Sequence, residues 1–65
     1  MQSWNQINNF VAVARTENMS EAAELLHISQ PSLSQTIKRL EEELGFPLFE
    51  RRGKRLMLNE HGKIM

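Results

Sequence analysis

The side chains best placed to do chemistry lie in one stretch, residues 29–45, which the sequence predicts to be a helix. Ser29 is a residue type that often caps a helix by accepting a hydrogen bond from its first turn. Pro31 follows in that turn, where its missing N–H costs nothing, and Gly45 stands where a glycine commonly ends a helix. The outward side chains of this helix therefore decide what the chain can bind.

This predicted helix has one apolar and one polar face. Branched aliphatic residues recur at i, i+4, i+7 and i+11, a spacing that places them on one stripe. They are Leu33, Ile37, Leu40 and Leu44. The opposite face starts with short neutral polar side chains, continues with two cations and ends in the acidic run 41–43. Its residues are Pro31, Ser32, Gln35, Lys38, Arg39 and Glu42.

The order of these side chains favours insertion into a DNA major groove by the N-terminal half of the helix. A helix lying along DNA over its whole length would hold three glutamates against phosphates. Entry by the N-terminal half keeps those acids outside. Ser32, Ser34 and Gln35 would then meet base edges. Lys38 and Arg39 would meet phosphate.

A second group of cations lies at residues 51–55, Arg-Arg-Gly-Lys-Arg. Pro47 stops the helix from continuing, and an extended segment begins at Leu48. Gly53 supplies a turn, after which leucines return with strand alternation. We predict a two-stranded β ribbon over 48–58. A basic tip beside a helix-turn-helix reaches a flanking groove, so contact with DNA is favoured over a solvated loop.

The net charge of zero hides an uneven distribution. Residues 1–27 hold one arginine against three glutamates, and residues 41–49 hold three further glutamates. Residues 28–40 hold two cations and no acid, and residues 50–65 hold five cations against two acids. A polyanion responds to the local field, so the two basic blocks outweigh the neutral total.

Several functions are disfavoured by composition. The chain has no cysteine, and its two histidines are isolated, so neither a disulfide nor a zinc site is expected. His27 as a metal ligand or general base lacks a partner nearby in sequence, and no nucleophile–base pair or phosphate-binding glycine loop is present. We expect no enzyme, no cofactor and no membrane span, and the cytoplasm as compartment.

The remaining elements must position these side chains. Ser3 and Gln6 have capping-box spacing, and apolar residues then repeat on a helix that runs to about residues 15–17, with Asn18 as its stop. That stripe consists of Trp4, Ile7, Phe10, Val11 and Ala14. Trp4 is read as a core residue rather than a base-stacking platform. A second helix is predicted from Ser20 to Leu26.

The second helix and the turn after it should set the crossing of the helices. Ala22 and Ala23 would let the next helix cross closely, and Leu25 and Leu26 would supply apolar contacts. The turn 27–29 would bury Ile28 and hold the two helices at a steep angle, as in a helix-turn-helix. His27 is a residue type that tolerates the left-handed conformation at such a turn.

The C-terminal residues start one further helix. Asn59 is a suitable cap and Glu60 is favourable in the first turn, whereas Gly62 is a poor helix former. A single turn of helix is marginal alone. We therefore expect a fragment of a longer protein, with residues 59–65 as the start of a truncated linker helix.

The residues from Ala22 to Arg51, followed by the segment L-N-E-H-G, resemble the N-terminal DNA-binding domain of LysR-type transcriptional regulators. Two blocks carry the resemblance, S-Q-P-S-L-S and L-E-E-E-L-G-F-P-L-F-E-R. It implies a mainly α, winged helix-turn-helix domain over 1–58, with recognition helix 30–44 and wing 48–58. The DNA-binding residues expected from the pattern and the resemblance together are Gln30, Pro31, Ser32, Ser34, Gln35, Lys38, Arg39, Arg52, Lys54 and Arg55.

The resemblance also implies partners. They are an operator half-site of double-stranded DNA, a second copy in a homodimer or tetramer, and a small-molecule inducer bound by an effector domain outside this chain. Gln35 stands where arginine is often found in the family, so the base preference of the family at that position applies least to this chain. The alternative is a winged-helix module that binds protein and not DNA, which would carry an exposed apolar patch in place of the basic tip.

Overall fold

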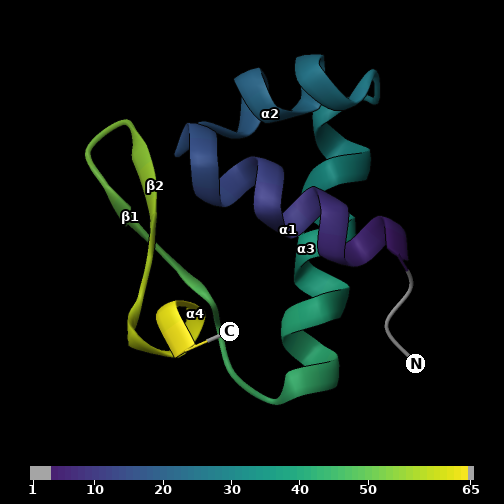
Figure 1. Cartoon of the computed structure of the whole chain (residues 1–65). Helices are drawn as coiled ribbons and strands as arrows, with labels where there is room; N and C mark the ends of the chain where they lie inside the picture. The colour runs from purple at the N-terminus through teal and green to yellow at the C-terminus, as the bar shows by residue number, and fades with distance from the viewer. Residues whose placement is uncertain (1–3, 65) are drawn as a thin grey trace.

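The helices and strands follow the order α–α–α–β–β–α (Figure 1). The computed structural model describes residues 4–64, without the side chain of Trp4. The elements are α1 (Trp4–Thr16), α2 (Met19–Leu26), α3 (Gln30–Leu44), β1 (Phe49–Arg52), β2 (Arg55–Leu58) and α4 (Glu60–Ile64). The expected winged helix-turn-helix is confirmed, with β1 and β2 forming the wing. The predicted Ser3 capping box and the packing of Trp4 lie outside the described residues.

Helix α3 begins and ends where the sequence predicts. The Ser32 N–H donates to Ser29 Oγ at 3.2 Å, and Gly45 closes the helix with a φ of 86°. Leu33, Ile37 and Leu40 are buried in the core, whereas Leu44 at the C-terminal end is half-buried. The stripe predicted from spacing is therefore the buried face of this helix.

Helix α2 begins one residue earlier than predicted. Asn18 is its N-cap, and the Asn18 side chain accepts the Glu21 N–H at 2.9 Å. Asn18 was predicted only as the stop of the first helix, and the same residue type also caps the next one. His27 ends the helix in the left-handed conformation with a φ of 58°, as the turn required.

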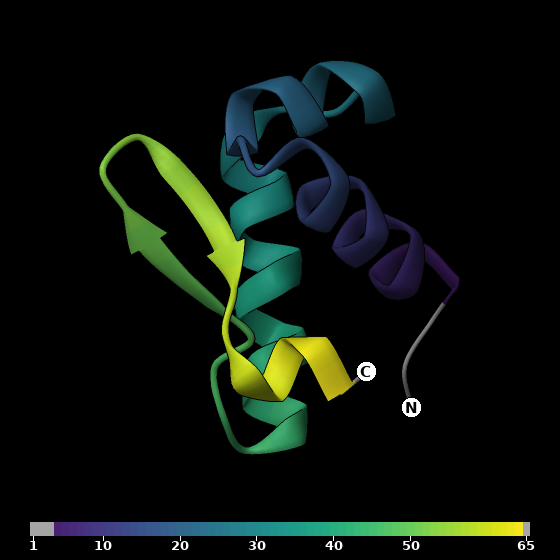
Figure 2. The ribbon, with the colours of Figure 1, turned by 60° about the vertical axis from the view of Figure 1, so that its left-hand side comes forward.

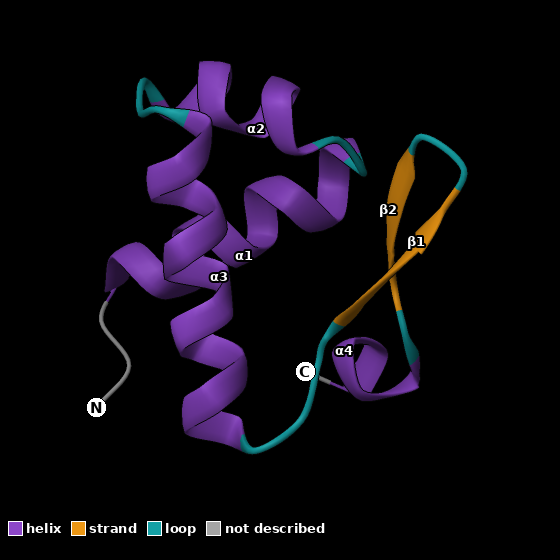
Figure 3. Ribbon diagram, turned by 180° about the vertical axis from the view of Figure 1, so that it is seen from behind, coloured by secondary structure: helices purple, strands orange, loops and turns teal. Residues whose placement is uncertain are grey.

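The core lies where α1, α2 and α3 cross (Figure 3). Ala22 and Ala23 are buried there, which confirms the predicted close crossing. Leu26 packs against this cluster, but Leu25 points outward and is 64% exposed. The predicted contact from Leu25 was wrong because the short helix α2 is covered only along its alanine side.

Two predictions of apolar burial in α1 and the turn were also wrong. Phe10 of the predicted stripe packs against the core, but Ile7 and Val11 are 42% and 38% exposed, and α1 buries Val13 instead. Val13 also lies at helical spacing from Phe10, so periodicity could not choose between these positions. Ile28 is 37% exposed, because the turn closes through its backbone N–H, which donates to the Ala23 carbonyl at 3.1 Å.

The hairpin stands beside the helices, and its tip lies at the same end of the molecule as the N-terminus of α3 (Figures 1 and 2). The strands are antiparallel, with Arg51 opposite Leu56 and Arg52 opposite Arg55. Gly53 forms the turn with a φ of 61°, as expected. Strand β1 begins at Phe49, not Leu48, because Leu48 is buried and turns its carbonyl to the Asn59 N–H at 2.9 Å.

Helix α4 is fixed to the loop between α3 and β1. Asn59 caps it as predicted, accepting the Gly62 N–H through Oδ1 at 2.9 Å, while its Nδ2 donates to the Pro47 carbonyl at 2.9 Å. The rings of Phe46 and His61 stack with centroids 4.4 Å apart. These contacts set the direction in which α4 leaves the domain.

Close packing explains why a glycine, a poor helix former, stands at position 62 within α4. A Cβ at this position would lie 2.4 Å from the Leu48 carbonyl oxygen, a backbone atom. We expect Gly62→Ala to lower the free energy of unfolding by about 2 kcal/mol, since overpacking outweighs the better helix propensity of alanine. Thermal denaturation should show a loss of roughly 10 °C in Tm.

Lys63→Ala is the matched control, because Lys63 is exposed on the same helix. We expect its melting temperature to stay within a few degrees of that of the parent. An unchanged or raised Tm for Gly62→Ala would show that the packing of α4 on Leu48 does not stabilise the domain.

Candidate nucleic-acid interface

The predicted contact residues of α3 are all exposed on its N-terminal two thirds. They are Gln30, Pro31, Ser32, Ser34, Gln35, Lys38 and Arg39. The cap at Ser29 and the buried leucine stripe fix this helix, so its outward residues are held on a rigid element. A rigid, exposed helix of this size is the element that the major groove accommodates.

These residues do not form one uniform face. Ser34 and Lys38, one turn apart, line a groove against the hairpin that also includes Arg51. Ser32 and Arg39 lie on the other flank, because seven residues are close to two full turns. The Ser32 Oγ accepts the Ser29 hydroxyl at 2.9 Å, so this side chain belongs to the helix cap. Ser34 and Lys38 thus lie on the side of α3 that faces the wing.

Gln30 is held by a residue of α2. The Ser20 hydroxyl donates to Gln30 Oε1 at 2.8 Å, joining the first turn of α2 to the first residue of α3. The amide of Gln30 keeps both of its N–H donors for another acceptor. This bond could not be predicted from sequence, because it depends on the angle between the two helices.

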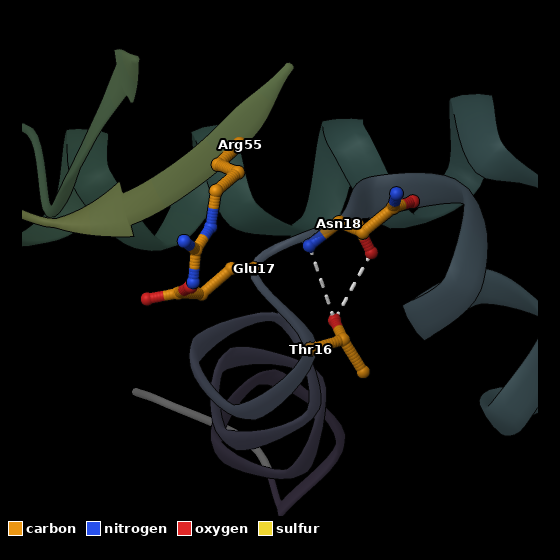
Figure 4. Close-up of polar contacts among 4 residues, drawn as sticks. All are labelled: Thr16, Glu17, Asn18 and Arg55. Atoms are coloured by element: carbon orange, nitrogen blue, oxygen red, sulfur yellow. Dashed lines mark hydrogen bonds and ion pairs between the residues drawn. The ribbon is translucent and has the colours of Figure 1, made fainter. Parts of the chain in front are cut away.

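Two of the three predicted wing cations are paired with carboxylates. Arg52 contacts Glu50 at 3.2 Å on the same strand. The Arg55 guanidinium is paired with Glu17 at the end of α1 (Figure 4). Lys54 is exposed at the tip, and among residues 4–64 no ion pair involves it. The cations of the wing therefore differ in how available they are to a polyanion.

Sequence reasoning missed Arg51. Strand pairing places it opposite Leu56, a residue whose side chain packs against the core. Opposed residues share a face of the ribbon, so Arg51 lies on the side that faces the helices, whereas Arg52 lies on the other side. The alternation of the leucines in β2, combined with the register, was the signal that could have identified it.

Glu17 fixes the wing against the helices. Its carbonyl accepts the Leu56 N–H at 2.9 Å, and its carboxylate holds Arg55. Glu17 has a φ of 55°, which is unusual for a residue other than glycine. Next to it, the Asn18 N–H donates to Thr16 Oγ1 at 3.3 Å (Figure 4). The turn between α1 and α2 is thus closed by side chains and positions the hairpin.

The acidic end of α3 lies away from its N-terminal face. Glu41 accepts the Leu48 N–H at 2.7 Å and so supports the loop that follows the helix. Glu42 and Glu43 are exposed in the last turn. Glu42 and Glu43 therefore lie away from a polyanion that approaches the N-terminal half of α3, whereas Glu41 lines the groove that also holds Lys38 and Arg51.

Within the described part of the chain, none of the helices combines the length and the hydrophobicity that a membrane crossing needs. No group of three or more histidine and acidic side chains among residues 4–64 is arranged to hold a metal ion. The exposed side chains on the N-terminal two thirds of α3 and at the hairpin tip are mainly hydrogen-bonding groups and cations, which match an anionic, hydrogen-bonding partner.

A helix-turn-helix with an exposed polar second helix, followed by a cationic hairpin, defines the winged helix-turn-helix class of DNA-binding domains. Residues 4–63 match the family of bacterial regulatory helix-turn-helix proteins, lysR family. The chain belongs to this family, and it is a LysR-type DNA-binding domain, as the sequence indicated.

Relatives of known sequence are longer than this chain. It is 46% identical over 61 residues to an uncharacterized HTH-type transcriptional regulator, YybE, of Bacillus subtilis, covering 94% of this chain and 21% of that protein. It is 48% identical over 61 residues to a RuBisCO operon transcriptional regulator of Allochromatium vinosum, covering 94% of this chain and 20% of that protein. The chain thus spans about a fifth of the length of these relatives.

Solved structures share the fold closely. A LysR-family transcriptional regulator from Eggerthella lenta superimposes with a TM-score of 0.90 at 41% identity, covering 97% of this chain and 90% of that chain. The CbnR DBD in complex with DNA superimposes with a TM-score of 0.91 at 36% identity, covering 97% of this chain and 72% of that chain. The fold is therefore one that binds DNA in a similar protein.

Proposed function

We propose that this chain recognises one operator half-site of double-stranded DNA in a sequence-specific manner. The N-terminal half of α3 enters the major groove, and the wing lies at the adjacent minor groove. The observation that supports this arrangement is the common end of the molecule shared by the N-terminus of α3 and the hairpin tip (Figure 2). Both elements can meet one duplex from that end.

The residues divide into readers and anchors. Gln30, Pro31, Ser34 and Gln35 face base edges, since they are exposed and uncharged on the leading half of the helix. Ser32 contributes from the cap. Lys38 and Arg39 bind phosphates on either side of the groove, and the wing adds Lys54, Arg52 and Arg55. Arg52 and Arg55 reach DNA by exchanging their carboxylate partners for phosphate.

A protein-binding role is less well supported. The large hydrophobic side chains exposed among the described residues are Ile7, Val11, Leu25, Ile28 and Ile64. They all lie outside α3 and the hairpin. A protein-binding module would carry its exposed apolar patch on α3 and the hairpin instead.

The whole protein, in this proposal, is a cytoplasmic transcription regulator with no enzymatic activity. It forms a homodimer or tetramer through a linker helix that continues α4, and an effector domain elsewhere in the protein binds a small-molecule inducer. Two linked domains bind two half-sites with far higher affinity than one, through effective concentration and without new base contacts.

Selection of duplexes from a random pool on this chain tests sequence specificity and gives the half-site. We expect Gln35→Ala to weaken binding to the selected duplex by about 1–3 kcal/mol, because a bidentate contact to one base is lost. Binding to random duplexes should hardly change, and the preference at one base position should relax.

Glu24→Ala is the control, because Glu24 is exposed on α2, outside the proposed interface. Fluorescence anisotropy on selected and random duplexes measures both variants. If Gln35→Ala weakens binding to the selected and the random duplexes equally, Gln35 does not recognise a base. If selection recovers no preferred sequence, the proposed function is wrong.

A further inference from the structure

A groove runs between the wing and the first turns of α2 and α3. Its volume is about 310 Å³, and its walls include Ser20, Gln30, Arg51 and Lys54. These residues come from three separate elements, and the register of the hairpin brings Arg51 to face the helices. Among residues 4–64, none of those that line this groove is acidic.

The charges of the wing are distributed so that this groove is its most cationic side. Arg52 is paired with Glu50, and Arg55 is paired with Glu17. Arg51 and Lys54 both line the groove, and neither takes part in an ion pair among residues 4–64. Carboxylates of β1 and of the turn after α1 thus neutralise Arg52 and Arg55, and the two wing cations at the groove, Arg51 and Lys54, are in no ion pair among residues 4–64.

The wall formed by α2 and α3, opposite the wing, adds neutral hydrogen-bond donors. The Ser20 hydroxyl donates to Gln30 Oε1 at 2.8 Å, which orients the amide and leaves its N–H groups to donate elsewhere. The guanidinium of Arg51, the ammonium of Lys54 and the amide of Gln30 can all donate hydrogen bonds to an anionic oxygen. None of the three groups carries a negative charge that would attract a cation. Guanidinium and ammonium groups form strong charge-assisted hydrogen bonds with phosphate oxygens, so a phosphodiester of DNA fits this set of donors.

We propose that this groove seats one backbone phosphate of the operator, on the strand that passes from the major groove under α3 to the minor groove under the wing. Arg51 is its principal cation, Lys54 is the second, and the bond between Ser20 and Gln30 fixes the facing wall. The proposal rests on the proposed function. It assigns the anchoring of the wing to Arg51, a residue that lies within the family resemblance but not among the DNA contacts expected from it.

The test neutralises phosphates one at a time. The selected duplex is made with a single methylphosphonate, an uncharged replacement, at each backbone position in turn, and affinities are measured by fluorescence anisotropy. For the parent chain we expect one position where neutralisation weakens binding about tenfold, the loss expected for one charge-assisted hydrogen bond. Arg51→Gln should weaken binding to the unmodified duplex to a similar extent.

If Arg51 binds this phosphate, the effects on affinity of Arg51→Gln and of neutralising the phosphate are not additive. In Arg51→Gln, neutralising that same phosphate should cost less than a further twofold, whereas Arg51→Lys should keep part of the penalty. Arg15→Gln removes an exposed arginine of α1 outside the interface and should leave the profile of penalties as in the parent. Circular dichroism verifies that each variant is folded.

The proposal is overturned if Arg51→Gln keeps the full penalty at every position, or if Arg52→Gln cancels the penalty in its place. A parent profile without any sensitive position in the strand between the two grooves also overturns it. These results differ from failure of the proposed function, because selection and Gln35→Ala report sequence reading whether or not Arg51 holds a phosphate.

Discussion

A fourfold rise in salt, from 50 to 200 mM, is expected to lower the affinity of this chain for its selected duplex by roughly two orders of magnitude. The reason is counterion release. Four cations of α3 and the wing that take part in no ion pair among residues 4–64, Lys38, Arg39, Arg51 and Lys54, each neutralise a phosphate, which gives a slope of log affinity against log salt of roughly −3.6. Arg52 and Arg55 add little to the slope, because each gives up a carboxylate when it binds a phosphate. This steep response comes from a chain of zero net charge, because six of its eight cations lie in two short blocks, on α3 and on the hairpin.

Anisotropy titrations at several salt concentrations measure this slope. Lys38→Gln should make it shallower by about one, because one phosphate contact is lost. Lys63→Gln removes an exposed cation at the far end of the domain and should leave the slope as it is. A flat response in the parent chain would exclude phosphate binding as the source of affinity and with it the proposed arrangement.

Leu33→Ala is expected to lower the free energy of unfolding by about 2–5 kcal/mol. Leu33 is fully buried and belongs to the cluster where α3 crosses α1 and α2. The total stability expected for a domain of this size is of order 3–10 kcal/mol. The variant therefore loses a large part of its stability, and α3 loses its position as the groove-binding helix.

Leu25→Ala is the matched control, because it removes the same side chain from a position that is 64% exposed. Urea denaturation followed by circular dichroism should place its stability within about 0.5 kcal/mol of the parent. Equal losses in the two variants would contradict the core described here.

The local features of α3 could be predicted because their signals lie within the element. A serine cap, an early proline, a final glycine and a regular leucine stripe each act through neighbours in sequence. Asn59 was predicted as a cap for the same reason. The family resemblance, carried by two blocks of consecutive residues, predicted the order of the remaining elements.

The features that sequence did not predict depend on contacts between elements. The outward position of Ile7 and Val11 depends on which side of α1 meets α3. The role of Gly62 depends on the approach of Leu48, fourteen residues earlier in the chain. In the candidate site, the pairing of Arg55 with Glu17 and the inward position of Arg51 both follow from how the hairpin is placed.

These contacts also explain why the cations of the wing are unequal. A sequence shows four basic residues around one glycine and gives no reason to separate them. The register of β1 and β2 assigns them to different sides, and the carboxylates of Glu50 and Glu17 then neutralise two of them. Of the four basic residues at the tip, Arg51 and Lys54 are therefore the two that take part in no ion pair among residues 4–64.

Amide chemical-shift mapping with the selected duplex tests most directly the claim that the N-terminal half of α3 and the wing tip meet DNA together. The largest changes are predicted at Ser34, Gln35 and Gly53, with little change at Glu24 and Glu42. Changes concentrated at Glu24 and Glu42, with Ser34 and Gly53 unaffected, would contradict this arrangement.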